Sequence, residues 1–140
     1  MRKLTVAARV DQLANVLAFV EGELSSRCPE KARARLSLAA EEVFVNIARY
    51  AYAPGEGKID ISLTVSGDPP VATLVFCDGG APYNPLETPD PDVTLGAGDR
   101  EIGGLGIYLA KKSVDEMRYR YENGQNVLVL VKSLDGSGKP

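Results

Sequence analysis

The chain has 140 residues, a formal net charge of −3 and no histidine. This length suits a single domain with one hydrophobic core, and the slight negative charge argues against a direct nucleic-acid partner. The lack of histidine excludes histidine catalysis, histidine metal ligands and a phosphohistidine. The two cysteines, Cys28 and Cys77, form no metal or redox motif, so we interpret them as reduced thiols.

The first residues do not read as a targeting segment. Arg9 and Asp11 interrupt the apolar core that a signal peptide needs. No stretch of the sequence approaches the length of a membrane span. We therefore expect a cytoplasmic protein with no membrane partner.

The first half of the chain predicts a strand followed by two helices. Residues 4–8 fit a short strand, and apolar residues then recur at helical spacing to about residue 26, with Asp11 as the N-cap. A second helix starts near Pro29 and ends before residues 54–57. The buried stripe of this second helix consists of Leu36, Ala40, Val43, Ile47 and Tyr50.

A polar stripe lies beside the apolar one on the second helix, formed by Glu42, Asn46 and Arg49. The spacing of four residues puts the Glu42 carboxylate and the Asn46 amide one turn apart on the same face. An amide oxygen suits Mg²⁺, and a carboxylate can accept a proton. Taken alone, Glu42 is better explained as a solvated helix residue, so the stripe needs support from other parts of the chain.

The second half of the chain predicts most of a sheet. Residues 58–65 alternate between apolar and polar side chains, as in a strand with one buried face, and residues 71–77 are apolar on both sides, as in a central strand. Two further strands, at 117–121 and 127–131, flank an Asn123-Gly124 turn, which is a strong hairpin signal.

Between these strands lies a segment of a different kind. Residues 84–103 are rich in proline, glycine and acidic side chains, which predicts a long mobile lid. A third helix opens at Gly103, and residues 135–140 read as a disordered tail. The whole predicts one domain over residues 1–134, an α/β protein folded as a two-layer sandwich. Its sheet is mostly antiparallel and its helices cover one face.

Two glycine-containing turns carry further chemistry. Asp78 ends the strand at 71–77 and is followed by Gly79 and Gly80, so a carboxylate stands beside backbone bare enough for a flat ligand. The Gly103–Gly106 segment opens a helix, where free N–H groups and the helix dipole favour phosphate. Each turn on its own is also explained by ordinary loop structure. Together with Glu42 and Asn46, they describe a nucleotide site.

The three segments, taken in order, resemble a known family. Residues 41–52 (Glu-Glu-Val-Phe-Val-Asn-Ile-Ala-Arg-Tyr-Ala-Tyr) and residues 103–112 (Gly-Gly-Leu-Gly-Ile-Tyr-Leu-Ala-Lys-Lys) are similar to its N box and second glycine box. The ATP-binding fold is the one shared by histidine kinases, DNA gyrase and heat-shock chaperones, known as the GHKL fold. Within it, the chain resembles the small bacterial anti-sigma-factor serine kinases.

The resemblance implies a role for each motif residue. Asn46 would hold Mg²⁺ between the phosphates, and Glu42 would deprotonate the substrate serine. Asp78 would accept a hydrogen bond from the adenine amino group, and Gly80 would let the base pack against backbone. The phosphates would be held by the segment that opens the third helix and by two arginines: Gly103, Gly104, Leu105 and Gly106, with Arg49 and Arg100.

The resemblance also implies partners and cofactors. Members of the family form homodimers, bind a sigma factor and use ATP with Mg²⁺ to phosphorylate a small anti-anti-sigma (STAS-type) protein on serine. An alternative is a non-catalytic module that binds nucleotide only to control its hold on a sigma factor or another regulator. A third reading is a scaffold that has lost nucleotide altogether.

Overall fold

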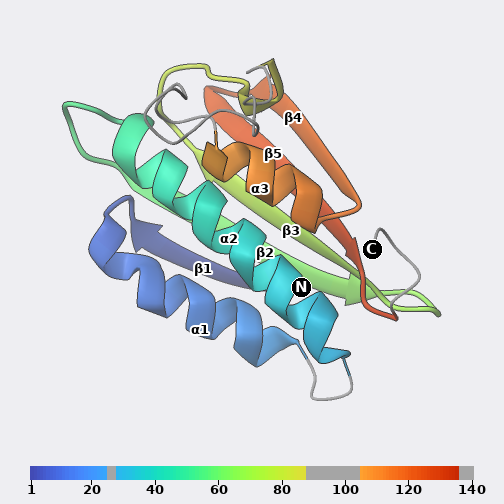
Figure 1. The fold of residues 1–140 in the computed structure, drawn as a ribbon. Coiled ribbons are helices and arrows are strands. Elements are labelled where there is room, and N and C mark those ends of the chain that lie inside the picture. The colour runs from blue at the N-terminus through green and yellow to red at the C-terminus, as the bar shows by residue number, and fades with distance from the viewer. Residues whose placement is uncertain (25–27, 88–104, 136–140) are drawn as a thin grey trace, which may run out of the picture.

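The structure of the protein is a computed structural model, which describes residues 1–24, 28–87 and 105–135. Five strands form one sheet in the order β1-β2-β3-β5-β4, and every neighbouring pair is antiparallel. Three α-helices lie side by side on one face of the sheet, with α2 in the middle (Figure 1). In chain order the elements are β1 (Arg2–Ala7), η1 (Val10–Gln12), α1 (Leu13–Glu23), α2 (Glu30–Tyr50), β2 (Lys58–Ser66), β3 (Val71–Asp78), η2 (Pro85–Glu87), α3 (Leu105–Ser113), β4 (Glu116–Glu122) and β5 (Gln125–Ser133).

This arrangement confirms the predicted two-layer α/β fold. The core lies between the helices and the sheet, because alternate residues of each strand point to the helix side. From the sheet it receives Ile59, Ile61, Leu74, Phe76 and Leu130, and from α2 it receives Leu36, Val43 and Phe44; all are at most 1% exposed. Since α2 is packed from beneath and flanked by α1 and α3, its position on the sheet is tightly fixed.

The turn between β4 and β5 is the predicted hairpin. Asn123 and Gly124 have φ angles of 53° and 75°, so both central residues adopt the left-handed conformation. Asparagine and glycine are the residues that tolerate this conformation best. The hairpin sets the register of β4 against β5, and the separate pairing of β3 with β5 places Asp78 opposite Asn126.

Three local expectations differ from the structure. Tyr50 is not part of the buried stripe of α2: it is the last residue of the helix and is 56% exposed. Asp11 is not the N-cap of α1, because it lies within the short η1 turn, where its Oδ1 accepts a hydrogen bond from Arg9 Nε at 3.2 Å. Gln12 occupies the cap position. The start of the predicted lid is folded: Pro85–Glu87 form η2, and the preceding Asn84 accepts at Oδ1 from Leu86 N at 2.9 Å. The rest of the predicted lid and tail, residues 88–104 and 136–140, lies outside the described residues.

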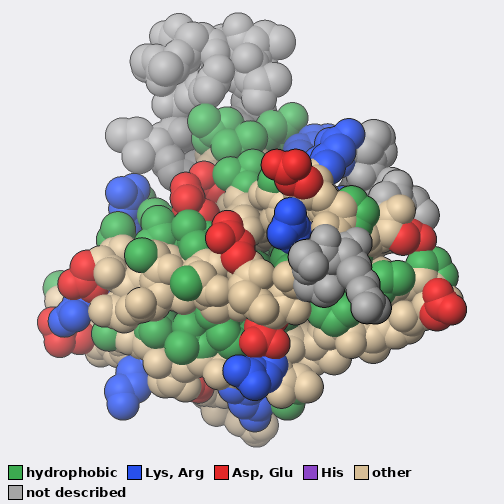
Figure 2. Space-filling model, turned by 90° about the horizontal axis from the view of Figure 1, so that it is seen from below, with side chains coloured by type: hydrophobic (Ala, Val, Ile, Leu, Met, Phe, Trp, Pro, Cys, Tyr) green, Lys and Arg blue, Asp and Glu red, His purple; other side chains and the backbone are tan. Residues whose placement is uncertain are grey.

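The apolar character of the helices and the charge on one face of the molecule were also compared with the sequence-based expectations. Within the described part of the chain, no helix combines the length and the apolar character that crossing a membrane requires. On the face in Figure 2, the coloured Lys and Arg side chains are interspersed with Asp and Glu side chains rather than gathered into a basic stripe. A nucleic-acid footprint depends on such a stripe, so this face gives no support to one.

Candidate functional site

The carboxylate of Asp78 stands at the end of β3, at the edge of the helix layer. Asp78 is only 5% exposed. Oδ1 accepts hydrogen bonds from Gly80 N at 2.9 Å and from Asn126 Nδ2 at 3.0 Å. Both of the hydrogen bonds that described residues give to Asp78 therefore end on the same oxygen. This arrangement fixes the plane of the carboxylate while leaving Oδ2 for a ligand.

Asn126 is the site residue that the sequence analysis missed. Besides Asp78, its Nδ2 lies 3.0 Å from Ala81 O and 3.3 Å from Gly80 O. Its Oδ1 accepts from Tyr83 N at 3.0 Å and from the Tyr119 hydroxyl. A sequence signal did exist, because Asn126 occupies the position of β5 that points to the core side, in line with Leu128 and Leu130. A polar residue in an inward-facing position needs partners, and they are the groups around Asp78.

Tyr52 holds the same turn from the other side. Its hydroxyl donates to Lys58 O and accepts from Gly79 N, both at 2.6 Å. The tyrosine ring lies so close to Gly57 that a Cβ on this glycine would be 2.2 Å from the ring. The turn after Asp78 is therefore pinned by Tyr52 on one side and by Asn126 on the other.

Gly80 has a structural reason to be glycine. A Cβ at this position would lie 2.2 Å from Ala51 O and 2.7 Å from Ala51 C, which are backbone atoms at the C-terminal end of α2. Contacts below 3.0 Å with backbone cannot be relieved by a side-chain rotation. The glycine thus lets the turn pack against α2. Its predicted part in receiving the adenine base stays a prediction.

At the other end of the site, Glu42 of α2 meets the beginning of α3. A Cβ on Gly106 would lie 2.6 Å from Glu42 Oε2, so the carboxylate rests against the bare backbone of the second residue of α3. The structure therefore brings together two of the segments that the sequence analysis singled out. Burial raises the pKa of Glu42, the nearby Glu41 carboxylate raises it further, and Arg49 acts in the opposite direction.

Asn46 lies one turn beyond Glu42 and is half-buried, whereas Arg49 is exposed. Arg49 is close enough to Glu42 to influence its pKa, so the three stripe residues do share one region. Among the described residues, no group of three histidine, cysteine or acidic side chains gathers to hold a metal. An amide such as Asn46 fits Mg²⁺ only as one of several oxygen ligands, the others coming from phosphate and water.

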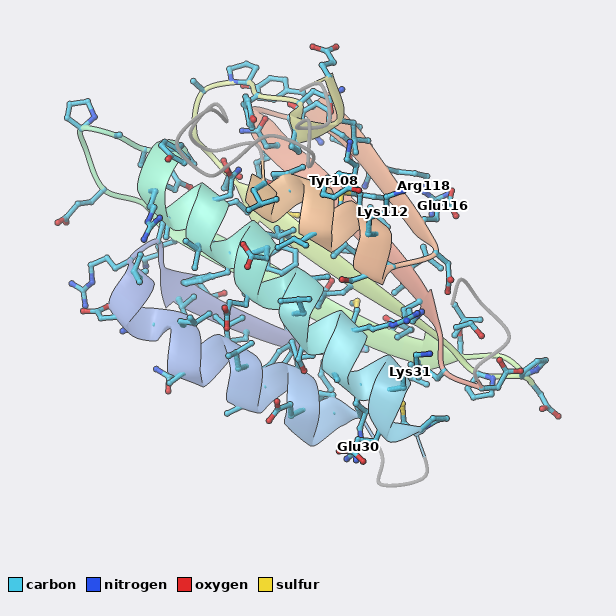
Figure 3. All side chains as sticks on the ribbon, in the orientation of Figure 1. Glu30, Lys31, Tyr108, Lys112, Glu116 and Arg118 are labelled. Atoms are coloured by element: carbon cyan, nitrogen blue, oxygen red, sulfur yellow. The ribbon has the colours of Figure 1, made fainter. Side chains whose placement is uncertain are left out.

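The helix that would face the phosphates is α3, which has nine residues and packs against α2. Leu105 and Gly106 form its first turn, and Arg100, Gly103 and Gly104 lie outside the described residues. Figure 3 labels Tyr108 and Lys112, one turn apart on α3, and the Lys112 ammonium lies 5.6 Å from the centre of the Tyr108 ring. Lys111 and Lys112 also place positive charge in the last turn, which favours the helix dipole.

Comparison with known proteins agrees with this geometry. The family model of the histidine kinase-like ATPase domain matches residues 6–132. A relative from Bordetella bronchiseptica, the serine/threonine-protein kinase BtrW, is 30% identical over 107 residues, which cover 76% of this chain and 75% of the relative. The predicted family and fold are thereby confirmed. A domain of this ATPase type implies nucleotide binding, and the residues assigned to the site stay predictions.

Proposed function

Because the chain belongs to the histidine kinase-like ATPase domain family, we propose that it is an ATP-dependent serine kinase of the anti-sigma type. In this proposal it binds a sigma factor and phosphorylates an anti-anti-sigma, STAS-type protein on serine. The observation that carries the proposal is the approach of Glu42 to Gly106. A half-buried carboxylate at the start of a helix, where phosphate is favoured, is what a kinase of this kind needs.

Helix α2 relates the two ends of the site. Ala51, which caps its C-terminal end, contacts the turn at Gly80, and Glu42 contacts α3 nine residues earlier. At 1.5 Å per residue, the two contacts lie about 13 Å apart along the helix. That separation is comparable with the length of an extended nucleoside triphosphate. It supports a pose in which the base lies near Asp78 and the terminal phosphate lies near Glu42.

In that pose the base end determines what is bound. The adenine amino group would donate to Asp78, whose Oδ2 receives no hydrogen bond from the described residues. The N–H groups at the start of α3, from Leu105 and Gly106, would hold phosphate together with Gly103 and Gly104. Arg49 and Arg100 would add positive charge to the terminal phosphate.

The metal in this proposal is Mg²⁺, held by the Asn46 amide oxygen together with phosphate oxygens and water. Bound there, the cation would neutralise part of the phosphate charge. The amide contributes one neutral oxygen, which matches a metal that arrives with its nucleotide rather than one held permanently by the protein. This assignment accounts for a half-buried amide whose side chain makes no hydrogen bond to the described residues.

The transfer step assigns one role to Glu42. Its carboxylate accepts the proton of the substrate serine hydroxyl while the serine oxygen forms a bond to the γ-phosphorus. The bond from that phosphorus to the bridging oxygen breaks, and ADP leaves with the electron pair. Positioning supplies much of the rate in such reactions, so the fixed place of Glu42 on α2 matters as much as its basicity.

The proposed partners rest on the resemblance of the motif boxes and on family membership. The relative described above is named a serine/threonine-protein kinase, which supports a kinase assignment over an ATPase without a protein substrate. A homodimer is part of the proposal. Sigma-factor binding, and hence control of transcription, follows from the same resemblance.

The direct test is phosphotransfer. The purified protein is incubated with γ-labelled ATP and Mg²⁺, together with the anti-anti-sigma protein encoded in the same genome. The expected result is label on the partner, absent when its acceptor serine is replaced by alanine. ATP binding measured by calorimetry accompanies the assay. Binding without transfer to any such partner would contradict the kinase proposal and favour a nucleotide-gated binding module.

A further inference from the structure

Both the NH₂ group and the oxygen of the Asn126 side chain make hydrogen bonds around the turn that follows Asp78. The side chain is 6% exposed, and its Nδ2 faces the Asp78 carboxylate and the carbonyl of Ala81, each at 3.0 Å. Its Oδ1 faces two donors, the Tyr83 N–H and the Tyr119 hydroxyl. An amide turned the other way would set its NH₂ against a backbone N–H and its oxygen against a carboxylate. The orientation of Asn126 is therefore dictated by its surroundings.

This orientation determines which oxygen of Asp78 is available. Asn126 and the Gly80 N–H both donate to Oδ1, at 3.0 Å and 2.9 Å. The described residues donate nothing to Oδ2. A carboxylate with one oxygen held twice has a fixed plane and a fixed direction for its second oxygen. A hydrogen-bond donor on a ligand would therefore approach Oδ2 of Asp78.

We propose that Asn126 is the positioning residue of the base site: it holds Asp78 so that Oδ2 accepts from the exocyclic amine of the purine, and Tyr119 holds Asn126 in the orientation that does so. The inference rests on the proposed function, since it concerns the same nucleotide site. It assigns base selectivity to a pair of residues on β4 and β5, outside the three motif segments.

The competing explanation is that Asn126 only ties residues 80–83 to the sheet. Its contacts with Gly80, Ala81 and Tyr83 would serve that purpose whatever ligand is bound. The two explanations differ in one measurable respect. A tether affects all nucleotides alike, whereas a positioning residue affects only nucleotides with an amino group for Asp78 to accept.

The experiment compares ATP with purine riboside triphosphate, which lacks the 6-amino group, by calorimetry on the full chain. Asn126→Asp keeps the size of the side chain and the oxygen that Tyr83 and Tyr119 meet, but replaces the donating NH₂ by an oxygen facing Asp78. Loss of a hydrogen bond to a charged group leads us to expect ATP affinity to fall about tenfold or more. The affinity for purine riboside triphosphate is expected to stay within about threefold.

Tyr119→Phe is the second variant, because it deletes one hydroxyl and keeps the ring. It is expected to weaken ATP binding about two- to fivefold and to spare the analogue. In the kinase assay both variants should raise KM for ATP while leaving kcat near the unmodified value. Matched controls are Asn15→Asp on α1, a hydrogen-bonded surface asparagine, and Tyr121→Phe on β4, a 45% exposed tyrosine. Both controls should leave the two affinities unchanged.

Equal losses for both nucleotides, or no loss for either, would overturn the inference while leaving the proposed function intact. An unmodified protein that binds neither nucleotide would overturn the proposed function and this inference with it. Thermal melting of each variant identifies misfolding. Should Asn126→Asp fail to fold, Tyr119→Phe decides alone, since an unchanged ratio of the two affinities in that variant contradicts the positioning role.

Discussion

The two ends of the candidate site are built in opposite ways. At the base end, Asn126 donates to the Asp78 carboxylate at 3.0 Å, and both residues are buried. The Tyr52 hydroxyl accepts from Gly79 N, in the turn after Asp78, at 2.6 Å. At the phosphate end, the side chains of Glu42 and Asn46 make no hydrogen bond to any residue that the structure describes, and both are half-buried. One end is therefore held by hydrogen bonds within the protein, whereas the polar side chains at the other end have no such bonds to the described residues.

The difference is what we expect if one end recognises the ligand and the other carries out the reaction. Groups that only recognise a ligand gain affinity by being held in advance, because less ordering remains to be done on binding. Groups that carry out chemistry need a charge state tuned to the reaction, and burial without a partner is how a carboxylate acquires a raised pKa. Changes at the phosphate end should therefore act mainly on transfer, and changes at the base end mainly on binding or folding.

The largest expected effect comes from Glu42→Gln. The amide keeps the shape of the side chain and cannot accept the serine proton, so the rate of phosphotransfer should fall about 10²- to 10⁴-fold. ATP affinity should change little, because the proposed base contact is with Asp78. Initial rates with labelled ATP and calorimetry on the same samples give the two numbers.

The matched control is Glu41→Gln, which removes the neighbouring carboxylate on the same helix and should retain transfer near its best pH. Transfer retained in Glu42→Gln would remove Glu42 from the reaction. A parallel loss of ATP affinity would instead end the proposed separation between the two ends of the site.

A smaller effect is expected from Asp78→Asn. Losing a charge-assisted hydrogen bond should weaken ATP binding by roughly 1–3 kcal/mol, and kcat at saturating ATP should stay near the unmodified value. Asp60→Asn on β2 is the control, since Asp60 is an exposed carboxylate that accepts from Thr5 Oγ1 at 2.6 Å. Unchanged ATP affinity in Asp78→Asn would reduce Asp78 to an ordinary turn residue.

Next in size is a pair of glycine substitutions that test the rigidity of the base end. Gly80→Ala places a Cβ 2.2 Å from Ala51 O, so backbone must move, and overpacking of this kind costs about 1–3 kcal/mol of folding free energy. Gly22→Ala, in α1, meets nothing within 4 Å and should stabilise the protein by about 0.5–1 kcal/mol through helix propensity. Urea unfolding of both variants measures the difference, and a Gly80→Ala variant as stable as the parent would show that the turn can move.

Much of the fold follows from local sequence patterns. Alternation along residues 58–65 and the Asn123-Gly124 pair depend on neighbouring residues alone, and both were predicted correctly. The apolar stripe of the second helix was predicted correctly at Leu36, Ala40, Val43 and Ile47 but not at Tyr50, which is 56% exposed. Asp11 shows where such reasoning fails. An aspartate before an apolar run is a common N-cap, but here a short η1 turn precedes α1 and its geometry moves the cap to Gln12.

The site was only partly predictable for a related reason. Glu42, Asn46 and Asp78 belong to motifs that can be recognised along the chain. The contact between Glu42 and Gly106 joins residues 64 positions apart, and the bond between Asp78 and Asn126 joins residues 48 positions apart. The partner of Asp78 is set by the β3–β5 register, and register depends on the whole sheet. Asn126 was overlooked because one inward-facing amide in a strand of valines and leucines has no motif of its own.

The smallest expected effect concerns pH. Because the pKa of Glu42 is raised by burial and then by Glu41, the acid side of the phosphotransfer profile should lie at higher pH than for an ordinary glutamate. Glu41→Gln removes one of these causes, so the acid limb should move to lower pH. A rate profile of the two proteins from mild acid to neutral pH makes the comparison. A limb that stays in place would mean that Glu42 does not set it.

The same shift predicts a change in stability with a definite sign. A carboxyl whose pKa is higher in the folded state binds its proton more tightly when folded, so its contribution to stability is fully present below the unfolded pKa. That contribution is lost as the pH rises through the folded pKa. Glu42→Gln has no such loss, so its melting temperature relative to the parent should increase with pH across this window. A Glu42→Gln variant that is less active but more stable at neutral pH is the result expected if the carboxylate serves the chemistry at a cost in stability. A difference in melting temperature that does not change with pH would mean that folding does not raise the pKa of Glu42.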